Sequence, residues 1–212
     1  MKFEILIALS FLSMSCFGQD SFVPPGYKII EEKMGDLDRD GISERVIVYD
    51  TNDTTEDGIV RELQVLKKSN ETWTIWKKSR NAVLKSQEGG MAGDPFEGIE
   101  IEKGILIVSV SGGSSWKWSY KDKYRFQNGN LELIGYSNTF GKACEYWEDI
   151  DFNLSTGKII YKKEFEDCDK GQEIYKTENE TFYKKGISID LSNRNSKKLK
   201  IISPKYKHEL YL

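Results

Sequence analysis

The sequence is poor in the residues that most often mark an active site. Among its 212 residues it has one histidine and three cysteines. It lacks a His-x-x-x-His pair, closely spaced cysteines and a phosphate-binding glycine loop, so zinc and nucleotide chemistry are not indicated. A Gly-x-Ser-x-Gly nucleophile elbow is also absent. The single histidine, His208, lies near the C-terminus, where we expect a surface side chain.

The sequence also lacks a strong charge bias and any long helical pattern. Lysine and arginine number 31 and aspartate and glutamate 34, giving a formal net charge of -3. The two signs are interspersed, so no nucleic-acid surface is expected. No run of helical spacing exceeds two turns, and alternation of apolar residues with frequent turn residues predicts strands instead.

The N-terminus is typical of a targeting segment. Lys2 precedes an apolar run, 5–12, that is too short to span a bilayer stably. We expect residues 1–18 to be a signal peptide and 19–212 a single β-rich domain, periplasmic or secreted, with no transmembrane segment after cleavage. The alternative is a lipoprotein anchored through Cys16, because the residues before it form a weak lipobox.

The predicted fold is all-β, with antiparallel meander sheets arranged as a β-propeller-like fragment or a β-sandwich. Short turns such as Asn128-Gly129 separate neighbouring strands, which must then pair antiparallel. Residues 51–58 are expected to form a mobile loop, and the alternative is that they lend the metal site another oxygen. Strands are expected at 27–34, 44–50, 60–68, 71–78, 97–102, 105–110, 116–127, 130–137, 146–154, 158–165, 173–184 and 199–202.

The most informative stretch of the chain is an acidic loop, 36–44. Carboxylates occupy positions 1, 3, 5 and 9, and Gly41 at position 6 allows a sharp reversal. Calcium takes six to eight oxygen ligands, which alternate side chains of such a loop can supply together with one carbonyl. The predicted calcium ligands are the side chains of Asp36, Asp38, Asp40 and Glu44 and the carbonyl of Ile42.

This loop differs from an EF-hand, because position 12 is Ile47 and strand-like sequence lies on both sides. It resembles the calcium loops of FG-GAP and VCBS-type repeats. The alternative is a solvated acidic turn without a metal, in which four neighbouring carboxylates would repel one another.

Two further motifs follow, Gly-Asp-Pro-Phe-Glu-Gly-Ile at 93–99 and Gly-Gly-Ser-Ser-Trp-Lys-Trp at 112–118. With the acidic loop, in this order, they resemble a family of uncharacterised exported proteins of Bacteroidota. The resemblance covers about residues 24–137 and implies no activity. The C-terminal third is outside it.

An aromatic row in the second motif is a candidate binding face. Trp116, Trp118 and Tyr120 are two residues apart, so in a strand their side chains share one face of the sheet. Such a row can stack on sugar rings or apolar peptide groups. More often such a row packs in the core, which is the favoured interpretation here, and the exposed binding face is the alternative. Trp73 and Trp76 do not extend it, because their odd spacing places them on opposite faces.

A disulfide between Cys144 and Cys168 is predicted from hairpin register. Ser155-Thr156-Gly157 suits a three-residue loop, which would place Leu154 opposite Lys158. Continued to the open end, that register sets the two cysteines opposite each other, within the range of a disulfide. The alternative is two free thiols at a frayed end.

Two classes of function fit these observations. The favoured one is a calcium-binding, non-catalytic exported module that binds a glycan or an envelope protein as its partner, or only contributes structure. The alternative is a small envelope-polymer hydrolase using acidic residues, for example Glu148 with Asp149 or Asp151. Acidic pairs are common in this chain, so the sequence does not favour catalysis.

Overall fold

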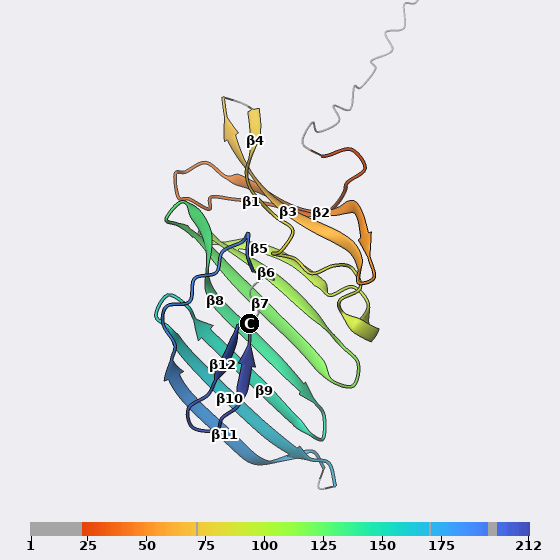
Figure 1. The fold of residues 1–212 in the computed structure, drawn as a ribbon, viewed down its shortest axis with the longest axis vertical. Coiled ribbons are helices and arrows are strands. Elements are labelled where there is room, and N and C mark those ends of the chain that lie inside the picture. The colour runs from red at the N-terminus through yellow and green to blue at the C-terminus, as the bar shows by residue number, and fades with distance from the viewer. Residues whose placement is uncertain (1–22, 71, 170, 195–198) are drawn as a thin grey trace, which may run out of the picture.

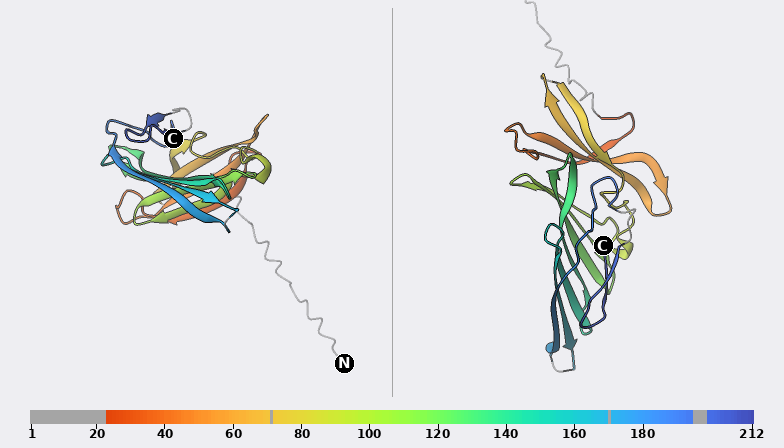
Figure 2. Two further views of the ribbon diagram at one scale, coloured as in Figure 1. Left: turned by 90° about the horizontal axis from the view of Figure 1, so that it is seen from below. Right: turned by 60° about the vertical axis from the view of Figure 1, so that its left-hand side comes forward.

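The computed structural model describes residues 23–70, 72–169, 171–194 and 199–212. The predicted signal peptide and Cys16 lie outside these residues. The described chain is all-β, as predicted, with antiparallel strands in a four-stranded sheet, a seven-stranded sheet and a short hairpin. Figure 1 shows the four-stranded sheet above the larger one, and the turned views show the C-terminal segment along one face of the larger sheet (Figure 2).

Both sheets are meanders in which sequence neighbours pair. The four-stranded sheet has the order β1-β2-β3-β4, and the seven-stranded sheet runs from β5 to β11 in sequence order. The first sheet comprises β1 (Lys28–Gly35), β2 (Glu44–Thr55), β3 (Gly58–Ser69) and β4 (Thr72–Ser79). The second comprises β5 (Phe96–Glu102), β6 (Ile105–Gly113), β7 (Lys117–Gln127), β8 (Asn130–Lys142), β9 (Tyr146–Asn153), β10 (Lys158–Asp167) and β11 (Glu173–Tyr183). The hairpin is β12 (Lys200–Ile202) and β13 (Glu209–Tyr211), and a 3-10 turn spans Gly90–Ala92.

The twelve predicted strands are all present within a few residues of their expected bounds. The mobile loop predicted at 51–58 is wrong, since β2 and β3 continue into it and pair as far as Thr55 opposite Gly58. A register shift between Asp50 and Thr54 accommodates the polar residues that suggested a loop. Strand β13 was not predicted, because three residues are too few to show an alternation.

The main core lies where the two sheets face each other. Alternate residues of β2 and β3 pack against alternate residues of β5, β6 and β7. Trp76 contacts this core, whereas Trp73 packs on the other face of the first sheet, so their predicted separation is confirmed. The fully buried residues of the main core include Val46, Val48, Leu63, Val65, Leu106, Val108 and Tyr124.

The ion pair of a buried arginine with a half-exposed aspartate joins the two sheets and explains the Asp-Pro-Phe motif. Arg61 of β3 is 2% exposed and donates to both carboxylate oxygens of Asp94, with Nη1 2.6 Å from Oδ1. Its Nε also contacts Asp50 at 3.3 Å. Phe96 lies under the guanidinium, 5.6 Å from ring centroid to Cζ. Asp94 therefore fixes the start of β5 to the first sheet.

A second core lies beneath the β12–β13 hairpin. Ile201 and Leu210 of the hairpin cover buried residues of strands β8 to β11. Beside it, Arg194 donates from Nε to Asp122 at 2.6 Å, with both side chains nearly inaccessible to solvent. This ion pair anchors the segment that leads to the hairpin. The covered residues are Tyr136, Ile150, Phe152, Ile159, Tyr161 and Phe182.

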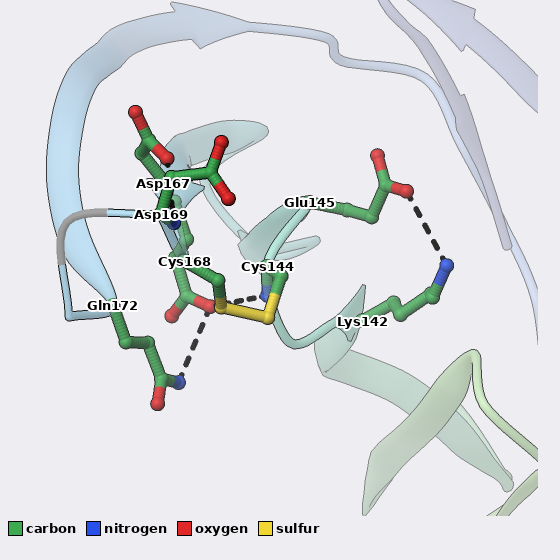
Figure 3. The surroundings of a disulfide bond; sticks show 8 residues. Lys142, Cys144, Glu145, Asp167, Cys168, Asp169 and Gln172 are labelled. Carbon is green, nitrogen blue, oxygen red and sulfur yellow. Dashed lines mark hydrogen bonds and ion pairs between the residues drawn. A yellow bond between two sulfur atoms is a disulfide. The ribbon is translucent and has the colours of Figure 1, made fainter.

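The structure joins Cys144 and Cys168 in a disulfide, with a Cα–Cα distance of 5.1 Å (Figure 3). The register used to predict this pair is nevertheless wrong, because Lys158 pairs with Asn153 and not with Leu154. The loop therefore has four residues rather than three. Both cysteines lie in turns beyond the strand ends, Cys144 with a φ of +69°, and this freedom lets them meet despite the shift.

Candidate functional site

The acidic loop connects β1 to β2 and is organised by its own backbone amides. The Asp36 carboxylate accepts hydrogen bonds from the amides of Asp40, at 3.1 Å, and Gly41, at 3.0 Å. Asp40 in turn accepts from the amide of Ile42 at 2.8 Å. Gly41 has a φ of +88°, so the reversal predicted at position 6 uses a conformation that favours glycine. These bonds turn the loop back over its own start.

Three of the predicted ligands converge. Asp36, Asp38 and Asp40 each offer one carboxylate oxygen, and these three atoms lie within 4.8 Å of one another. Oxygens at such separations can bind one cation, because a calcium ion sits about 2.3–2.6 Å from each ligand. The arrangement is the one predicted for positions 1, 3 and 5 of a calcium loop.

Glu44, the fourth predicted carboxylate, does not belong to this group of three but adjoins it. It is fully buried, and its Oε2 accepts a hydrogen bond from the Leu37 amide at 2.7 Å. Its Oε1 is buried and has no hydrogen-bond partner, as is true of Asp38 Oδ1. Buried carboxylate oxygens without a donor are costly unless a positive charge lies near them.

A lysine from the neighbouring strand supplies that positive charge. Lys67 of β3 places Nζ 2.8 Å from Asp40 Oδ2 and in hydrogen-bond contact with Asp38 Oδ2. The same nitrogen is 3.9 Å from Glu44 Oε1 and 5.1 Å from the centre of the Trp76 ring. The ammonium therefore lies among carboxylates that could otherwise face a metal ion.

The pKa values follow this arrangement. Hydrogen bonds to Asp38 and Asp40 raise the pKa of Lys67 well above its usual value. The hydrogen bond from Lys67, supported by the Ile42 amide, lowers the pKa of Asp40. Burial raises the pKa of Glu44, and the Asp38 and Asp40 carboxylates add to this increase. Lys67 thus neutralises the outer carboxylates better than it does Glu44.

Sequence reasoning missed Lys67, although the register of β2 with β3 could have indicated it. Arg45 pairs with Leu66, so the next residue of β3 reaches the end of the acidic loop. Finding it requires the strand pairing in addition to the loop motif.

The aromatic row is present and is partly buried. Trp118 and Tyr120 stack with ring centroids 6.1 Å apart, and Tyr120 contacts the core under the hairpin. Trp116 precedes β7 and stacks on Phe140 of β8, at 5.3 Å and 9°. The row therefore continues sideways across strands, and Tyr146 and Phe165, which the sequence did not single out, extend it.

The candidate catalytic groups do not form a site together. Strand alternation puts Glu148 on one face of β9 and both Asp149 and Asp151 on the other. His208 is about one-quarter exposed, so it is a partly covered side chain near the surface. Its Nε2 lies 2.6 Å from Glu178 Oε2, which ties the β13 end of the chain to β11.

Comparison with known proteins gives no match to a family model, a curated protein or a solved structure. In the described part of the chain, no helix has the length and apolar character needed to span a bilayer.

Proposed function

We propose that the protein is a calcium-binding, non-catalytic module of the periplasm or cell exterior, with the 36–44 loop as its metal site. Asp36, Asp38 and Asp40 would supply side-chain oxygens, with Glu44 and the Ile42 carbonyl completing the set. The disulfide is consistent with an oxidising compartment.

The observation that carries the proposal is the buried Glu44 Oε1. It has no hydrogen-bond donor and lies at the edge of a carboxylate cluster. A lysine ammonium 3.9 Å away is too distant to satisfy it. A divalent cation bound to the three aspartates would bring a stronger positive charge to this oxygen. A solvated turn without metal would not bury a carboxylate in this way.

Calcium binding must displace Lys67 from the aspartates. The lysine side chain is 30% exposed, so its ammonium can move into solvent without leaving a buried charge behind. The cost is the loss of the Lys67 contacts to Asp38 and Asp40, which is small because solvent screens these charges. The apo loop is thus held in shape by Lys67, and calcium replaces it.

Thermal unfolding tests the proposal. A ligand that binds only the folded state stabilises it by about 2.7 kcal/mol at a hundredfold excess over Kd. For a chain of this length the melting temperature should rise by about 5–10 °C in millimolar calcium relative to EDTA. Magnesium should give a smaller shift, because it demands a stricter octahedral geometry. Asp36→Ala with Asp40→Ala should remove the shift, and an unchanged wild-type melting temperature would count against calcium.

A further inference from the structure

A polar trough of about 540 Å³ lies where β1 meets the outer face of the seven-stranded sheet. Glu31 and Lys33 of β1 and Glu97 of β5 form its wall. Glu31 is held there because its Oε2 accepts the Ile99 amide at 3.0 Å. In β7 the side chains of Ser119 and Lys121 alternate with those of Trp118 and Tyr120 and so lie on the opposite face, although Tyr120 also borders the trough. The volume of the trough is typical of small-molecule sites.

The floor of the trough consists of two rows of polar side chains, most of them short hydroxyls. The first row pairs Ser109 with Lys121 and Lys121 with Ser137 across β6, β7 and β8. The second pairs Ser111 with Ser119 and Ser119 with Thr139. Facing side chains of adjacent strands are about 5 Å apart, so each row is a continuous line of polar groups across the sheet.

The composition of this floor differs from that of an ordinary solvent-exposed face of a sheet. The water-facing side of a sheet is usually covered by long or branched side chains, whereas serines leave the backbone surface low and create the hollow. Among the described residues, the hydroxyls of Ser109, Ser119 and Ser137 have no hydrogen-bond partner, and Lys121 has no ion pair. These groups are free to bind a ligand.

A second hollow, of about 270 Å³, continues the trough toward β9. It shares Ser111, Ser119 and Thr139 with the first and ends at Trp147. Trp147 pairs with Gly141, and a Cβ at Gly141 would lie 2.6 Å from the indole Cε3. The indole therefore lies over a glycine and borders the hollow with part of its ring.

The charges around the two hollows cancel. Carboxylates and ammonium groups are equal in number, so neither an anion nor a cation is selected by charge. Hydroxyl, carboxylate and ammonium groups together offer both donors and acceptors, and Trp147 adds an aromatic surface. The charged lining residues are Glu31, Glu97, Glu100, Lys33, Lys117 and Lys121.

We propose that this trough binds a neutral oligosaccharide, laid across the strands from Glu97 to Trp147. Sugar hydroxyls both donate and accept, matching the mixed polar floor, and the apolar face of a sugar ring can pack on the indole. The five strands from β5 to β9, spaced about 4.8 Å apart, give a path of about 19 Å, enough for a short oligosaccharide. The inference adds a ligand to the proposed module and does not require bound calcium.

An array of neutral gluco-, xylo-, manno- and chito-oligosaccharides, followed by calorimetry on each saccharide that is retained, tests the proposal. We expect at least one to bind, in calcium or in EDTA, and Trp147→Ala to weaken binding at least tenfold. Ser119→Gln, which adds neutral bulk to an exposed floor position, should have a similar effect without loss of the fold. Thr177→Gln, an exposed change on β11 of the same outer face, is the matched control and should bind like wild type.

Several results would overturn the trough as a saccharide site. One is no binding of any neutral saccharide at millimolar concentration by folded protein. Another is binding that survives both Trp147→Ala and Ser119→Gln. Loss of binding in Trp116→Ala alone would place the sugar on the aromatic row of the opposite face. If the protein bound only acidic saccharides on an array, the proposal of a site for neutral saccharides would be contradicted. Because binding is measured with and without calcium, this inference and the calcium proposal fail independently.

Discussion

Lys67 lies on β3 and Asp40 in the loop between β1 and β2, yet the ammonium nitrogen of Lys67 lies 2.8 Å from a carboxylate oxygen of Asp40. The contact places a tethered positive charge inside a loop whose sequence is typical of calcium sites. Calcium and Lys67 cannot both occupy that space, so they should compete.

Lys67→Met should therefore bind calcium about tenfold more tightly than wild type, since the metal no longer has to displace an ammonium group from Asp38 and Asp40. Without calcium the variant should be less stable, because the carboxylates lose their neutralising charge. Calorimetry gives the affinity, and Lys67→Arg, which keeps the charge, is the control. Equal affinities in wild type and Lys67→Met would show that the lysine does not compete.

Displacement of Lys67 should also change tryptophan emission. The ammonium lies 5.1 Å from the centre of the Trp76 ring, so its departure removes a charge from the indole face. Titration with calcium should shift the emission of wild type but not of Trp76→Phe or Lys67→Met. An identical shift in Trp76→Phe would assign the signal to another tryptophan.

Loss of the disulfide should lower the free energy of unfolding by about 3 kcal/mol, because the bond closes a loop between two residues that are 24 positions apart. Denaturant unfolding of Cys144→Ser with Cys168→Ser, compared with oxidised and reduced wild type, measures this. Reduced wild type and the double variant should agree. Mass spectrometry of oxidised protein must show one peptide pair joined through these residues, and two alkylated thiols would rule the disulfide out.

Asp94→Asn should cost about 1–3 kcal/mol, because it removes the main partner of the buried Arg61 guanidinium, while Asp94 itself is half-exposed. Adding Arg61→Met should recover part of this loss, since no buried charge then remains unpaired. Urea unfolding of the two single variants and the double variant gives the coupling. If the changes in the free energy of unfolding simply add, the contact between Arg61 and Asp94 does not stabilise the fold.

The same pair predicts a pH dependence. The Arg61 guanidinium lowers the pKa of Asp94 below its usual 3.8. A carboxylate with a depressed folded pKa stabilises the fold above its unfolded pKa and loses that contribution as pH falls through the folded value. Wild type should thus lose more stability than Asp94→Asn on acidification below about pH 4. Parallel acid profiles would contradict this assignment.

The strands and most turns were predictable because local patterns determine them. Asn128-Gly129 forms its hairpin with both residues at positive φ, as such a pair allows. Alternation also separates Trp73 from Trp76. The convergence of the aspartate side chains in the 36–44 loop was also predictable, because their spacing alone brings alternate side chains together.

What the sequence did not reveal depends on pairing between distant strands. Lys67 reaches the loop through the β2–β3 register, and a one-residue error in the β9–β10 loop moved every predicted facing pair. The serine rows of the trough are scattered along β6, β7 and β8 and become neighbours only when those strands align. Such features follow from register, which short motifs do not specify.

Calorimetric titration of calcium into metal-free wild-type protein tests the central claim most directly. We predict binding of one ion per chain, with heat that disappears in Asp36→Ala with Asp40→Ala and weakens strongly in Glu44→Gln, which keeps the size of the buried side chain. Absence of any heat of binding at millimolar calcium, in wild type and in Lys67→Met alike, would contradict the claim that this loop is a calcium site.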